Sequence, residues 1–230
     1  AKKIVDSGIP IEELDEFLTF RHAVERNNRI QLRDPSRNVE TNPGSGSLKT
    51  GERLSNFYVK QTMENRYGYE WDDASGSWVG GNDRGKKLMD LAADADSIVN
   101  STIDRMIQGG LLSKDNAEAL RGLYKYYAPL KGKAQEDDFA DFVAVGSGLS
   151  TKGKEYKMAL GRESASESPL GHIMLNVERT IARSVKNENF GQKLVNLIKD
   201  NPNSEFWNVY DATDPRFKQA ADTYYTYVGS

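Results

Sequence analysis

Apolar residues recur at helical spacing along most of the chain, which predicts a mainly α-helical protein. The first such segment spans about residues 10–32 and starts with Pro10, a residue suited to a first helical turn. A second helix is predicted at about 50–66. Between 67 and 85, aromatic and glycine-rich stretches flank a turn and predict a small β-hairpin.

The strongest amphipathic pattern begins at Asn82 and predicts a long helix that ends at Gly109-Gly110. Ser113 then suits the N-cap of another helix, which Pro129 stops because the residue before a proline disfavours helical geometry. The short connection between these two helices predicts a helical hairpin.

The C-terminal third contains one further long helix. Residues 128–168 have no long amphipathic period and predict a loop with at most one strand, at 139–145. Ser168-Pro169 provides a cap and a first-turn proline for the long helix. Its predicted buried side consists of Leu170, Ile173, Met174, Val177, Ile181, Ser184 and Val185. Past Gly191 the apolar positions leave that side, so the helix bends there or meets another partner, and a short helix follows at about 204–210.

The predicted fold class is therefore mainly α: an irregular multi-helix bundle with a helical hairpin, one long C-terminal helix and at most a small β-hairpin. We expect residues 1–230 to form a single helical module, with a possible subdivision near the 128–168 loop. The chain opens at Ala1 without an initiator methionine, from which we expect a piece of a longer protein.

Composition narrows the function classes. The 230 residues include 31 Lys plus Arg against 34 Asp plus Glu, so the chain as a whole is not a basic nucleic-acid binder. The absence of cysteine excludes disulfides, thiolate metal sites and thiol nucleophiles. No run of about 18 apolar residues is present, so we expect no membrane span.

Candidate chemistry is sparse, and we predict neither a metal nor a cofactor. The only histidines are His22 and His172, and the pair His22 and Glu25 could ligate a metal only with carboxylates from elsewhere. Gly44-Ser45-Gly46 and Gly146-Ser147-Gly148 lack the remaining residues of a phosphate-binding loop and are expected to be turns.

A lytic enzyme is one alternative. Glu163-Ser164 and Glu167-Ser168 match the Glu-Ser dipeptide of lytic transglycosylases, but the Gly-Leu-Met-Gln box of those enzymes is absent. Both dipeptides are expected in a polar loop, where no apolar pocket raises a carboxyl pKa. We therefore predict no catalytic residue.

A basic stripe on the long C-terminal helix is the best candidate for binding nucleic acid. Its members fall within about 80° of one another on the helical wheel: Arg179, Arg183, Lys186 and Lys193. Such a stripe attracts phosphates regardless of sequence. Alternatively, this basic helix contacts the acidic outer face of the preceding long helix, formed by Asp90, Asp94 and Asp104.

Five short phrases occur in order along the chain. They are an HA-x-ERN run, a following Gly-Ser-Gly loop, a Y-x-P-L-[KR]-G phrase, a GKE…GR-x-S linker and an R-x-x-KN helix with a glycine after it, followed by NP and W. The residues that carry these phrases are His22, Glu25, Arg26, Asn27, Pro129, Gly161, Arg162, Asn187, Gly191 and Trp207. Together the phrases resemble a segment of large polyvalent proteins of tailed phages.

The resemblance implies a non-catalytic structural or interaction module of an internal virion protein, which lies in the virion interior and enters the host cell with the genome. Its implied partners are other virion or ejection proteins or other domains of the same long chain, with phage DNA as a further candidate. The alternative is a nucleic-acid-binding segment of a virion-associated RNA polymerase or antirestriction protein. Gly161-Arg162 is similar to a polymerase element, but Met158 stands where that element requires Thr or Asp.

Overall fold

A computed structural model describes residues 2–36, 38–39, 45–130, 162–165, 167–201 and 215–216. In chain order the elements are α1 (Lys2–Ser7), α2 (Ile11–Arg33), β1 (Ser45–Ser47), α3 (Asn56–Tyr67), β2 (Tyr69–Asp72), β3 (Ser77–Gly80), α4 (Asp83–Gln108), α5 (Lys114–Arg121), β4 (Arg162–Ala165), α7 (Pro169–Lys186), the π-helix η2 (Asn187–Gly191) and α8 (Gln192–Asp200). The protein is mainly α-helical with a small antiparallel sheet, which confirms the predicted fold class.

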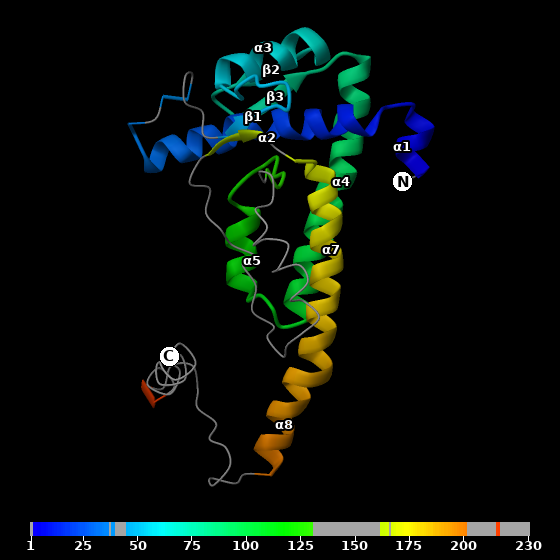
Figure 1. The fold of residues 1–230 in the computed structure, drawn as a ribbon, viewed down its shortest axis with the longest axis vertical. Coiled ribbons are helices and arrows are strands. Elements are labelled where there is room, and N and C mark those ends of the chain that lie inside the picture. Colours follow the sequence, from blue (N-terminus) through cyan, green and yellow to red (C-terminus); the bar gives the residue numbers. More distant parts are fainter. Residues whose placement is uncertain are drawn as a thin grey trace.

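The helices form a transverse layer and a long arm (Figure 1). α2 crosses α4 and is covered by α3 and the β2–β3 hairpin. α7 packs along α4, and α8 continues beyond them at the end of the molecule away from α2 (Figure 1). Among the described helices, none combines the length and apolar character that crossing a bilayer requires.

The core surrounds α2. Every residue from Phe17 to Val24 is buried, so the centre of this helix meets other elements on all its sides. Phe17 contacts the ring of Tyr67 edge-on, with 5.1 Å between the ring centroids. The consequence is that polar side chains in this stretch, such as Arg21 and His22, lie in the core and need partners there.

The predicted β-hairpin is confirmed. β2 and β3 are antiparallel, and Trp71 lies opposite Trp78 with 5.1 Å between their rings. The Trp78 indole Nε1 donates a hydrogen bond of 3.0 Å to the carbonyl oxygen of Arg21, which attaches the hairpin to α2. Trp78 is buried and Trp71 partly buried, so this pair belongs to the core rather than to an exposed partner surface.

Local capping signals explain why several predicted helices start where they do. Asn82 accepts a hydrogen bond from the backbone N–H of Gly85, and Ser168 accepts one from Gly171. Ser113 caps α5 through Asn116 in the same way. Each cap satisfies an N–H that has no partner within the helix.

Gly85, in the first turn of α4, yields a test of the packing between α4 and the hairpin. Alanine normally stabilises a helix interior relative to glycine by about 1 kcal/mol. Here a Cβ would lie 2.2 Å from the carbonyl oxygen of Tyr67. We therefore expect Gly85→Ala to lower the free energy of unfolding by about 2 kcal/mol, measured by urea denaturation.

Gly122→Ala is the matched control. Gly122 ends α5 with an ordinary φ of −78°, and its nearest contact for a Cβ is at 3.5 Å. This variant should be neutral or slightly stabilised. Equal stability of both variants would show that α4 is not pressed against Tyr67.

Two expectations about secondary structure are wrong. The helix expected at 50–66 begins only at Asn56, because the preceding residues form a turn and a bridge between Ser47 and Arg53. The second arm of the helical hairpin ends at Arg121 instead of continuing to Pro129, because Gly122 interrupts it.

A second two-stranded sheet was not predicted. Ser45 and Gly46, expected in a turn, belong to β1, and Glu163-Ser164, expected in a loop, belong to β4. The two strands pair in parallel. Parallel pairing needs a partner far along the chain, which local sequence does not reveal. The strand expected at 139–145 and the helix expected at 204–210 lie outside the described residues.

The buried side of α7 is only partly the predicted one. Ile173, Thr180 and Ser184 are buried, and α4 is the main partner of the helix. Three residues predicted on the buried side are exposed instead: Met174 by 52%, Ile181 by 50% and Val185 by 43%. The side of α7 that carries Thr180 and Ser184 therefore packs against α4, and the apolar stripe of Met174, Ile181 and Val185 is exposed to solvent.

Candidate functional site

The motif on α2 forms a group of side chains that we call the α2 polar cluster: Arg21, His22, Glu25, Arg26 and Asn27. All five side chains are polar or ionisable, yet all but Glu25 are buried. The resemblance places four of these residues together on one helix, and the structure adds the elements with which they interact.

Glu25 holds the segment that follows α5. Its carboxylate accepts hydrogen bonds of 3.0 Å from the backbone N–H groups of Lys125 and Tyr126. Arg29, one turn further along α2, donates to the carbonyl oxygen of Leu123 at 3.0 Å. Side chains of α2 thus replace the helical hydrogen bonds that this segment lacks.

His22 lies among aromatic rings. The ring of Tyr124 is 4.7 Å away and that of Tyr127 is 5.6 Å away, both edge-on. Its Nδ1 atom is 3.8 Å from Glu25 Oε2, beyond hydrogen-bond distance, and has no other hydrogen-bond partner in the described part of the chain. Burial lowers the pKa of His22, and the nearby Glu25 carboxylate only partly opposes this shift.

The lowered pKa of His22 predicts how stability depends on pH. The unfolded chain takes up a proton near pH 6.5, whereas the folded chain resists it, so the unfolded state binds more protons below that pH. Stability should therefore fall as the pH drops below about 6.5, by at most about 1.4 kcal/mol per pH unit. Urea denaturation at neutral and mildly acidic pH measures this slope.

His22→Gln should flatten that slope, while the matched variant His172→Gln at the other histidine of the chain should retain it. An unchanged slope in His22→Gln would show that other groups produce the dependence.

Asn27 is fully buried and joins three elements. Its Nδ2 donates to the carbonyl oxygen of Leu54 at 2.8 Å and to Asn56 Oδ1 at 3.0 Å. Its Oδ1 accepts a hydrogen bond from the Ser45 hydroxyl of β1. One amide group therefore positions β1, the start of α3 and the turn between them.

Arg21 connects α2 to α4. Its guanidinium forms a two-pronged ion pair with the Asp96 carboxylate, with 2.9 Å from Nη1 to Oδ2. The Arg21 side chain is 2% exposed, and Asp96 is 33% exposed. The guanidinium also lies 5.3 Å from the ring centroid of Tyr126. Sequence reasoning did not single out this residue, because its partner lies 75 positions away on another helix.

The α2 polar cluster thus connects α2 to the neighbouring elements of the fold. No known family, curated protein or solved structure matches this chain. Within the described residues, no group of three or more His, Asp or Glu side chains is placed to hold a metal ion. The side chains of the cluster are directed at backbone groups and rings of the protein itself.

The remaining motif residues are dispersed. Asn187 donates from Nδ2 to the carbonyl oxygen of Gly109 at 2.6 Å, which fixes the end of α7 against the end of α4. Pro129 is buried. The backbones of Arg162 and Gly191 lie in β4 and η2, whereas Gly161 and Trp207 fall outside the described residues.

The basic stripe is not one open face. Arg179, Arg183 and Lys186 are half-buried, and each already has an interaction within the protein. Burial lowers the pKa of Arg183. Lys193 is exposed, and its Nζ donates to Asn189 Oδ1 at 3.2 Å. Lys193 therefore differs from the three other candidates in being exposed to solvent.

The expected contact between acidic and basic helices takes a different form. α4 does pack on α7, but Asp94 pairs with Lys3 and Asp104 with Arg121. An ion pair does join α4 to η2, which directly follows α7, but its charges are the reverse of those expected. The basic residue, Arg105, lies on α4, and the acidic residue, Glu188, lies in η2 at 2.9 Å.

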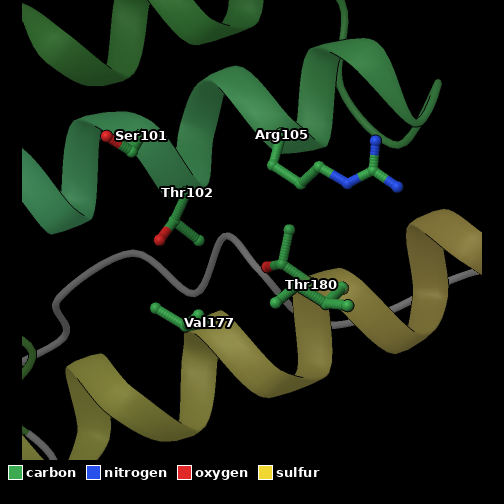
Figure 2. A pocket seen from close by; sticks show the side chains of 6 residues that line it. Ser101, Thr102, Arg105, Val177 and Thr180 are labelled. Atoms are coloured by element: carbon green, nitrogen blue, oxygen red, sulfur yellow. The ribbon is translucent and has the colours of Figure 1, made fainter.

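A groove between α4 and α7 was not apparent from the sequence. It contains an open hollow of about 350 Å³, lined by Ser101, Thr102, Arg105, Val177, Thr180 and Ile181. Figure 2 shows that Thr102 of α4 points towards α7, where Val177 and Thr180 lie on the side nearest α4. The lining is mostly apolar, and the Arg105 guanidinium is engaged by Glu188 at one end.

Proposed function

We propose that this chain is a non-catalytic structural and interaction module of a bacteriophage internal virion protein, which is carried in the capsid and enters the host with the genome. The phage assignment rests on the ordered resemblance of its motifs. The observation that best supports a non-catalytic role concerns the α2 polar cluster. Glu25 and Asn27 form their hydrogen bonds with the backbone and side chains of neighbouring elements.

The partners that fit this proposal are other virion or ejection proteins and other domains of the same long chain. The apolar residues exposed on α7 and α8 supply a surface for such contacts. Binding of phage DNA through the basic stripe is less well supported, because Arg179, Arg183 and Lys186 already interact within the protein. The same consideration applies to a role as a nucleic-acid-binding segment of a polymerase or antirestriction protein.

Two measurements test the proposal. Quantitative mass spectrometry of purified phage particles that encode the chain should find it inside the capsid, and labelled particles should deliver it into the host cell. Detection of the chain only as a newly made protein in infected cells would contradict the proposed location.

Fluorescence anisotropy with single- and double-stranded DNA tests the alternative. We expect no binding that weakens steeply with salt. Micromolar binding with a slope that Arg183→Ala and Lys186→Ala reduce by about one unit each would favour the nucleic-acid function instead.

A further inference from the structure

The groove between α4 and α7 has the form of a helix-binding site. Buried Thr102 and Thr180 line it, and the described residues leave it open on one side. Exposed apolar side chains follow the lining residues at spacings of three or four along the same helices: Ile98 precedes Thr102 on α4, and Met174 and Val185 flank Val177 and Ile181 on α7. A groove of this kind typically receives the apolar face of an amphipathic helix.

α8 is an amphipathic helix without a comparable partner in the described part of the chain. Its apolar residues Leu194, Val195 and Leu197 are 39%, 44% and 55% exposed. Its main packing contact among the described elements is η2, to which it is directly joined. A helix of nine residues is marginal by itself and normally gains its stability from packing.

The α8 of a chain cannot occupy the groove of the same chain. α7, η2 and α8 follow one another without a connecting loop, and α8 extends away from the groove (Figure 1). To fold back beside α7, the helix would need a reversal that η2 does not contain. Among the described helices, the occupant that remains is the α8 of another copy.

Size and charge agree with this occupant. Nine helical residues are about 14 Å long, comparable to the two turns of α4 that separate Ile98 from Arg105. On the helical wheel, Lys193 and Lys199 flank the apolar face of α8 on opposite sides. Glu178 is exposed on α7 between Met174 and Ile181. The α7 side of the groove thus offers an acidic group to a lysine of α8.

We propose that α8 of one copy binds in the α4–α7 groove of a second copy, and that the exchange is reciprocal in a symmetric dimer. This inference rests on the proposed function, because it names a second copy of this chain as one partner of the interaction module. Leu194 and Leu197 enter the groove beside Val177 and Ile181, and one of the lysines that flank this apolar face, Lys193 or Lys199, faces Glu178.

Sedimentation velocity and cysteine cross-linking test the proposal on the intact chain. The natural chain has no cysteine, so introduced thiols pair only with each other. We expect a dimer whose association constant falls about 100-fold in Leu197→Glu, since each leucine contributes about tenfold and acts twice. The matched variant Leu32→Glu alters an 82% exposed leucine on α2 and should remain dimeric.

In a mixture, Leu197→Cys chains and Ser101→Cys chains should form a disulfide-linked heterodimer on mild oxidation. Neither variant alone should cross-link efficiently, and Leu32→Cys should not replace Leu197→Cys. A monomer at the highest soluble concentration would overturn the proposal, as would equal cross-linking by the Leu32→Cys chain. These outcomes are read on purified protein, so they are distinguishable from a failure to find the chain in virions.

Discussion

Replacing Asp96 by alanine is expected to lower the free energy of unfolding by about 3–5 kcal/mol, because it leaves a buried charge without its partner. Arg21 is almost fully buried and forms its two-pronged ion pair with this carboxylate. At roughly 2–4 °C per kcal/mol for a chain of this size, the melting temperature should drop by about 10 °C. Thermal and urea denaturation, followed by circular dichroism, measure both quantities.

Asp94→Ala is the matched control, because it changes the same residue type two positions earlier on α4. Asp94 also forms an ion pair, with Lys3, but both side chains are more than half exposed. Such surface pairs contribute at most about 1 kcal/mol. If Asp96→Ala were no more destabilising than Asp94→Ala, the ion pair between α2 and α4 would not exist in solution.

Asn27→Ala is expected to cost about 3 kcal/mol or more, since it leaves several buried polar groups unpaired at about 1–3 kcal/mol each. The Leu54 carbonyl, the Asn56 amide and the Ser45 hydroxyl all lose a partner. This variant also tests whether the HA-x-ERN motif has a structural role. Denaturation measurements and hydrogen exchange of residues 45–56 should both report the loss.

The comparison variant is Asn65→Ala, at an exposed position of α3. Surface replacements of this kind usually stay within about 0.5 kcal/mol. A motif that serves binding rather than folding would give a different result: Asn27→Ala would then be as stable as Asn65→Ala.

Local signals explain how far the fold can be predicted from the sequence. The starts of α4, α5 and α7 follow from Asn82, Ser113 and Ser168, whose side chains cap the helix that they precede. The interruption near Gly191 is also confirmed, because η2 separates α7 from α8. These features depend on neighbours in the sequence, so a reading of periodicity and capping residues finds them.

Features that depend on distant partners could not be predicted in the same way. The side of α7 that faces α4 is set partly by Gly109, where a Cβ would lie 2.3 Å from the Ser184 hydroxyl. This close approach turns Ser184 inwards and Ile181 outwards, against the hydrophobic pattern of the helix. The candidate site shows the same division: the resemblance identified Glu25 and Asn27, but not the partners that give them a role.

The parallel pairing of β1 with β4 can form only late in the synthesis of the chain, because β4 lies far beyond β1 in the sequence. Ser45 leaves the ribosome long before Arg162, the residue with which it pairs. Until then α2, α3 and the β2–β3 hairpin can already pack, whereas the edge of β1 has no strand to bind. The same order applies to refolding, since contacts between distant segments form more slowly than those within helices. Pairing of β1 with β4 is therefore a marker for a late stage of folding, which on the ribosome is followed by the packing of α7 on α4. It would serve in the same way after the passage through a phage tail that the proposed function implies.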